Sequence, residues 1–252
     1  MSLALEFRSL KFGVWSFHMP NWLANTLRII LAAALPVVLV LTNVRLLLTP
    51  LYINWEYNLP NFPADFYGFT TEDRLAYSRI ALDYLLNDAG IEYLGDQNIP
   101  DDKIANPDFS RRYNEMYNGR ELKHMLDVKN VVKAALAVWR VCGMLVVGAV
   151  VALGWGVETR PLLRSGLLIG SGATLGLLIA LGLFIVFGFD AFFVLFHRVF
   201  FTGDTWLFRW SDTLIRLFPE KFWFDIFVWL AGGTLAEAAA IGAAAWWWLK
   251  AQ

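Results

Sequence analysis

The chain has 252 residues, of which 58% are hydrophobic, and its mean hydropathy is +0.49. This composition excludes an ordinary soluble domain, and its long apolar runs predict an all-α polytopic membrane protein. The net charge of −1 hides an acidic stretch, because residues 51–130 hold fourteen Asp or Glu against eight Lys or Arg. An acidic extramembrane segment argues against a nucleic-acid partner. The single cysteine, Cys142, excludes an intrachain disulfide and a cysteine-based metal cluster.

The N-terminal segment, residues 1–25, carries Trp15, Phe17 and Trp22 where a signal peptide would have a compact apolar region. We therefore expect it to lie on the membrane surface with its aromatic side chains turned inward. The first membrane span is predicted over residues 26–48, which is about the length needed for a ~30 Å hydrocarbon core.

Residues 49–130 are the only long polar stretch and are predicted to form an extracytoplasmic domain of helices and irregular segments. Thr70 followed by Glu72 and Asp73 indicates a helix start, since a hydroxyl cap and early acidic residues both favour a helix N-terminus. A further helix is expected to begin near residue 109 and to pass through His124 towards the membrane.

Three more spans are predicted over residues 131–155, 162–187 and 224–249. The stretch between the last two, residues 188–223, is aromatic but too often interrupted by charges to span, so we expect short helices lying in the interface. Lys and Arg in the short loops predict that both termini lie in the cytoplasm and the polar domain outside.

Two charged residues fall inside the predicted spans, Arg140 in the second and Glu237 in the fourth. A lone charge near the bilayer centre costs at least ~2.5–3.5 kcal/mol, so each is expected to have a partner. Their similar depths predict an ion pair between neighbouring helices. The alternative is a protonated Glu237 that bonds to a backbone carbonyl or a hydroxyl.

The strongest candidates for chemistry are two of the three histidines, His124 and His197, each beside a membrane boundary. Histidine ionises nearest to neutral pH, so two on one side of the membrane can form an acid–base pair with rings within about 8 Å. Glu121 and Asp127 lie three residues either side of His124 on one helix face and are candidates to orient its ring. The alternative is that each histidine is an ordinary interfacial residue.

His197 has its own candidate partners. Asp190 lies two helical turns earlier on the same face, and Arg198 and Asp204 follow closely along the chain. With Asp127 the two histidines supply enough ligands for zinc, but the HExxH spacing is missing and we predict no metal. No G-x-S-x-G element, P-loop or dinucleotide fingerprint is present, so no nucleotide cofactor is expected.

Three motifs resemble an integral membrane family that contains the bacterial lipoprotein intramolecular transacylases. They are Trp55-Glu56-Tyr57, the stretch from Glu121 through His124 to Lys129, and the stretch from Phe196-His197 to Phe222. The resemblance covers roughly residues 26–249. It implies four spans in the cytoplasmic membrane of a bacterium, with membrane lipid and the N-terminus of a lipoprotein as substrates. We expect no cofactor.

The resemblance also implies the reaction. An enzyme of this kind moves the sn-2 acyl chain of a diacylglyceryl-cysteine to the α-amine of that cysteine, and the family histidines correspond to His124 and His197. We expect His124, with its neighbouring carboxylates, to be the base and His197 to be the acid. A competing hypothesis is a non-catalytic accessory subunit of a larger membrane complex, whose aromatic helices pack against partners or pigments.

Overall fold

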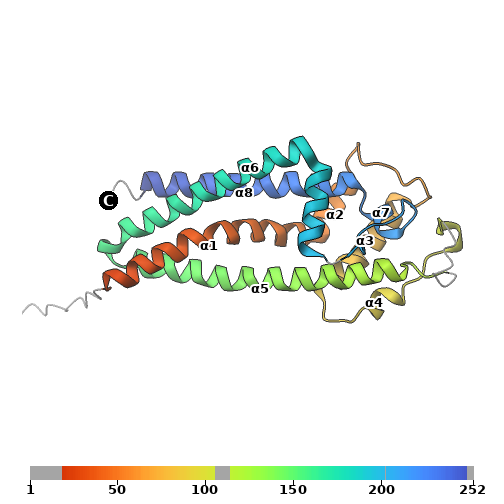
Figure 1. Ribbon diagram of the computed structural model, residues 1–252, viewed down its shortest axis with the longest axis horizontal. Helices are drawn as coiled ribbons and strands as arrows, with labels where there is room; N and C mark the ends of the chain where they lie inside the picture. The colour runs from red at the N-terminus through yellow and green to blue at the C-terminus, as the bar shows by residue number, and fades with distance from the viewer. Residues whose placement is uncertain (1–18, 106–113, 202, 249–252) are drawn as a thin grey trace, which may run out of the picture.

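The computed structural model describes residues 19–105, 114–201 and 203–248 (Figure 1). The predicted interfacial segment lies mostly outside these residues, although positions 21–25 belong to the first helix. Along this described part of the chain, eight α-helices follow one another: α1 Asn21–Leu47, α2 Pro50–Tyr57, α3 Thr71–Leu86, α4 Glu92–Gly95, α5 Gly119–Trp155, α6 Arg160–Phe200, α7 Thr213–Leu217 and α8 Glu220–Trp248. Within the described ranges no β-strand forms, and Asn98 and Glu115 make one isolated bridge. The predicted all-α class is therefore confirmed.

Four helices, α1, α5, α6 and α8, are long and apolar enough to cross a membrane. Helix α1 lies centrally, packed against α5, α6 and α8, and α6 also packs against α8 (Figure 1). Two glycines let α1 and α6 approach closely: a Cβ at Gly170 would lie 3.0 Å from atoms of Leu35 and 3.1 Å from the carbonyl oxygen of Ala32. Gly166 faces α1 in the same way, whereas Gly172 and Gly176 face open space.

The predicted Arg140–Glu237 ion pair is wrong. Arg140 lies exposed on α5, and the Glu237 carboxylate on α8 instead accepts a 2.9 Å hydrogen bond from the side-chain amide of Asn43 on α1. The physical reason is the central position of α1, which packs against both α5 and α8 and offers Glu237 a nearer polar partner.

Helix α6 bends at Gly188, where the backbone leaves helical geometry at φ −159° and ψ 52°. Beyond the bend, residues 189–200 turn across the direction of the other long helices (Figure 1). The bend comes one residue after the predicted end of the third span, and it carries His197 sideways rather than farther along the bundle.

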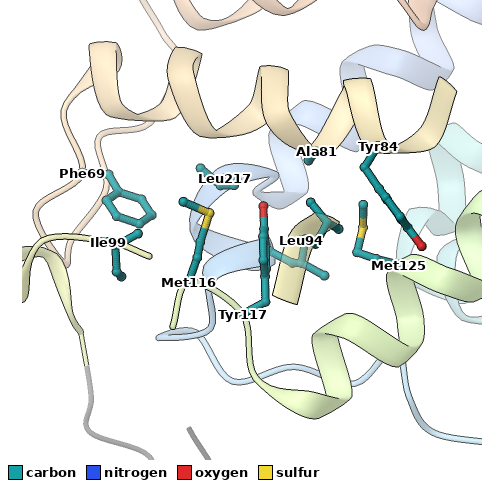
Figure 2. Packing of buried hydrophobic residues seen from close by; sticks show 10 residues of the cluster. Phe69, Ala81, Tyr84, Leu94, Ile99, Met116, Tyr117, Met125 and Leu217 are labelled. Carbon is teal, nitrogen blue, oxygen red and sulfur yellow. The ribbon is translucent and has the colours of Figure 1, made fainter. Parts of the chain in front are cut away.

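The polar part of the chain folds around its own hydrophobic core beside the end of the bundle. Figure 2 shows Ala81 and Tyr84 of α3 packed towards Tyr117, Leu94 and Met125. Helix α3 begins at a capping box in which Thr70 and Asp73 exchange hydrogen bonds, so the predicted helix start is confirmed. The predicted helix start near residue 109 lies outside the described residues. Helix α5 begins at Gly119, after the N-cap residue Asn118, whose side chain accepts hydrogen bonds from the first-turn amides of Arg120 and Glu121.

An ion pair joins the α7 segment to this core. Arg216 is 2% exposed, contacts Asp65 at 3.0 Å and lies over the ring of Phe69 at 3.4 Å. A second buried arginine, Arg74, donates to the carbonyl oxygen of Arg216 at 2.9 Å. Breaking a buried pair of this kind leaves an uncompensated charge, so these contacts hold α7 against residues 63–74.

The glycine contacts give a first test. Gly170→Val should lower the free energy of unfolding by about 1–3 kcal/mol, since the added side chain collides with α1. Gly176→Val, which meets no heavy atom within 4 Å at its Cβ, is the matched control. Thermal unfolding in detergent measures both, and equal losses in the two variants would contradict the described α1–α6 contact.

Glu56 gives a second test. Burial is the largest effect on Glu56 and the neighbouring Asp225 carboxylate is the second, and together they raise its pKa from 4.5 to about 7. Tyr52 and Lys221 lower this pKa by smaller amounts. Because the folded protein holds this proton more tightly than the unfolded chain, the stability contribution is present at low pH and is lost as pH rises from about 4.5 through 7. Glu56→Gln should therefore weaken the fall in melting temperature between pH 5 and pH 8. An unchanged slope in the variant would assign the pH dependence elsewhere.

Candidate active site

The two candidate histidines come from helices far apart in the sequence and meet at one place. His124 lies in the second turn of α5, and His197 lies in the last turn of α6, beyond the bend at Gly188. Their ring centres are 6.1 Å apart with planes inclined by 21°, and each side chain is 8% exposed. The predicted approach to within about 8 Å is confirmed.

Local packing explains how each ring is held. Met125, the neighbour of His124, is buried in the core of the polar domain and fixes the rotation of α5 about its axis. On the other helix, Phe192 is buried and contacts Phe227 of α8, which holds the segment after the bend against the bundle.

Aromatic side chains surround the pair. Their ring centres lie 4.8 Å (Phe201) and 5.2 Å (Phe208) from His124, and 4.1 Å (Phe193) and 4.9 Å (Trp206) from His197. Trp206 and Phe208 belong to the connection between α6 and α7, so this connection covers the two imidazoles from one side. Both histidines are thereby buried, and polar contacts in a buried site are stronger than in bulk solvent.

Hydrogen bonding distinguishes the two rings. Nδ1 of His197 lies 2.7 Å from the backbone carbonyl oxygen of Phe193. A carbonyl oxygen only accepts, so this nitrogen carries the proton, and in the neutral ring the lone pair is left on Nε2. Nδ1 of His124 is buried and has no hydrogen-bond partner among the described residues. The hydrogen bond to Phe193 therefore fixes the tautomer of His197.

The predicted supporting residues do not orient the histidines in the way the sequence suggested. Glu121 is fully buried, and its two carboxylate oxygens accept hydrogen bonds from the amides of Asn118 and Leu214. Asp127 is half-buried, without a hydrogen bond to His124. The remaining three are exposed and make no hydrogen bond to either ring: Asp190, Arg198 and Asp204. Proximity along the chain failed as a guide because the Glu121 carboxylate binds two backbone amides instead, those of Asn118 and of Leu214 in α7.

Several neighbours of the site were missed in the sequence. Asn118 with Glu121 three residues later forms a capping box, a spacing that could have been read beforehand. The approach of Trp206 and Phe208 had no local signal, because it depends on how the α6–α7 connection folds back. For a metal, no group of three or more His, Cys, Asp or Glu is placed to hold an ion within the described parts of the chain.

Comparisons with known proteins agree with this architecture. The family described as "Lipoprotein intramolecular transacylase Lit" matches residues 29–223. An uncharacterized protein of Aquifex aeolicus (strain VF5) is 32% identical over 199 residues, which cover 78% of this chain and 82% of that protein.

Solved structures of a membrane protein are also similar. The membrane integral lipoprotein intramolecular transacylase Lit from Bacillus cereus superposes with a TM-score of 0.69, covering 91% of this chain and 97% of the other at 19% identity. A variant of that protein with one histidine replaced by arginine gives a TM-score of 0.64 at 19% identity, covering 91% and 93% of the two chains. At this identity the likeness shows a shared fold.

The hydrogen bond to Phe193 yields a spectroscopic prediction. At a pH where both rings are neutral, ¹⁵N NMR of histidine-labelled protein should show His197 protonated on Nδ1 and unprotonated on Nε2. Resonances can be assigned by single His→Gln variants, since the chain has only three histidines. A His197 ring protonated on Nε2 would contradict the described hydrogen bond.

Proposed function

This chain belongs to the lipoprotein intramolecular transacylase family, and we propose that it moves the sn-2 acyl chain of a diacylglyceryl-cysteine to the α-amine of that cysteine. The observation that carries the proposal is the 6.1 Å approach of His124 and His197 from separate helices. Two imidazoles at this separation can both reach one bound substrate, which is the arrangement that paired proton transfer needs.

The reaction requires two proton transfers. The sequence favoured His124 as the base, but the hydrogen bond from His197 to Phe193 supports the reverse assignment, because it leaves Nε2 of His197 with a lone pair. In the proposed step Nε2 of His197 takes a proton from the amine, whose nitrogen bonds to the sn-2 carbonyl carbon. His197 passes that proton to the neutral His124, and His124 gives a proton to the glycerol oxygen as the bond from the carbon to this oxygen breaks.

The products are an N-acyl amide and a free glycerol hydroxyl, and both rings end neutral, as they began. Amine and ester belong to one molecule, so holding them in contact supplies much of the rate and no cofactor is required. The cover formed by Trp206 and Phe208 supports transfer over hydrolysis, since it limits the access of water to the ester.

The same proposal includes a location and a substrate source. The protein is an integral membrane protein, and we place it in the bacterial cytoplasmic membrane with both termini inside and the histidines outside. The Lys and Arg of the short loops support this orientation. Partners are then membrane lipid and the N-terminus of a lipoprotein. The convergence of the histidines does not favour a non-catalytic accessory subunit.

Replacing either histidine tests the proposal. His124→Gln and His197→Gln should each reduce formation of the N-acyl, lyso-glyceryl product by ~10²-fold or more without unfolding the protein, because each removes one proton transfer. Mass spectrometry of lipoprotein N-terminal peptides from cells producing each variant measures the product.

Asp190→Asn is the matched control, since Asp190 is exposed and makes no hydrogen bond to either ring. It should convert lipoprotein as the unmodified chain does. Full conversion by folded His197→Gln protein would remove that histidine from the mechanism, and no conversion by the unmodified chain would reject the proposed reaction.

A further inference from the structure

Glu121 lies at the junction between the helix that carries His124 and the segment that covers both rings. Its side chain is fully buried three residues before His124. Oε2 accepts a 2.8 Å hydrogen bond from the amide of Asn118, and Oε1 accepts a 2.7 Å hydrogen bond from the amide of Leu214. One carboxylate thus joins the first turn of α5 to the first turn of α7, 93 residues away.

Two further contacts join the same pieces of chain. The side-chain amide of Asn118 donates to Asp212 at 3.1 Å, and the same aspartate accepts from the backbone amide of Arg209 at 2.8 Å. The guanidinium of Arg120 donates to the carbonyl oxygen of Leu207 at 2.9 Å. Residues 206–214, the covering segment, are therefore fastened at several points to the start of α5.

The covering segment reaches both imidazoles. Trp206 contacts His197 at 4.9 Å between ring centres, and Phe208 contacts His124 at 5.2 Å. Movement of this segment relative to α5 would alter the packing of both rings together. Glu121, which accepts the hydrogen bond from Leu214, lies about one helical turn before His124 on α5. This bond therefore sets the position of the covering segment relative to the His124 ring.

We infer that Glu121 is a positioning residue for the acyl transfer, holding the covering segment over His124 and His197 through its bond to Leu214. The inference rests on the proposed function for its consequence on rate, while its structural part is independent of it. This role differs from that of an acid–base partner of His124, which the sequence suggested.

The chemistry of the site favours glutamate. Two backbone N–H groups face the two oxygens of one carboxylate, and an ionised carboxylate only accepts. Glutamine would turn an NH₂ group towards one of these donors, and a buried donor left without an acceptor is destabilising. Aspartate keeps the charge, but its side chain is one methylene shorter and cannot span both amides.

The experiment compares the full chain in detergent with Glu121→Gln and Glu121→Asp, using NMR of labelled histidine rings. Both variants should shift the ring resonances of His124 and His197, because the aromatic rings that pack on them move. Asp127→Asn is the matched control: it changes a carboxylate three residues from His124 on the other side, and it should leave these resonances in place. If Glu121→Gln does not fold, Glu121→Asp, which retains the carboxylate, carries the test.

Turnover provides the second measurement. Turnover per folded molecule should fall by at least ~10-fold in Glu121→Gln, with the pH dependence of the rate unchanged. A changed pH dependence with unmoved resonances would make Glu121 an acid–base partner and overturn the inference. Unmoved resonances with full turnover would overturn it as well. If the unmodified chain transfers no acyl group, the proposed function fails, and the resonances alone decide whether Glu121 holds the segment.

Discussion

The bend in α6 at Gly188 is the constraint on which the site depends. His197 follows the bend by nine residues, and a straight helix would carry it ~14 Å farther along its axis at 1.5 Å per residue. The bend instead turns residues 189–200 across the bundle and brings the ring to 6.1 Å from His124. Phe192 and Phe196 pack against Phe227 of α8 along the turned segment, so aromatic contacts hold the change of direction.

The polar domain completes the arrangement by fixing what lies opposite the turned segment. Its core contains Met125 from α5 together with Leu214 and Leu217 from α7, so the helix bearing His124 and the end of the α6–α8 connection share one hydrophobic cluster. Arg216 secures the same connection through Asp65, at a buried site where loss of either partner is costly. The connection between α6 and α7 is thus anchored at the end that leads into α7, and Trp206 and Phe208 contact the histidines from within this connection.

Much of this fold could be predicted because span length and helix caps are local properties. The four apolar runs, the N-cap of α3 at Thr70 and the interruption of the third span near residue 188 followed from composition and spacing. The ion pair of Arg140 with Glu237 could not be judged that way, since it required knowing that α1 packs against both α5 and α8. The prediction that Glu121 orients His124 failed for the same reason, because one of the two amides that bind its carboxylate, that of Leu214, lies 93 residues away. Tertiary contacts with backbone groups leave no pattern in the side chains.

In the proposed reaction the acyl chain moves within one substrate molecule at the histidine pair. A crossover experiment tests it most directly. Purified protein is given an equal mixture of two diacylglyceryl lipopeptides, one unlabelled and one carrying isotope in both its peptide and its sn-2 acyl chain. Transfer within one molecule predicts only the unlabelled and the doubly labelled N-acyl products by mass spectrometry. Singly labelled products in statistical proportion would show transfer between molecules and would contradict the account.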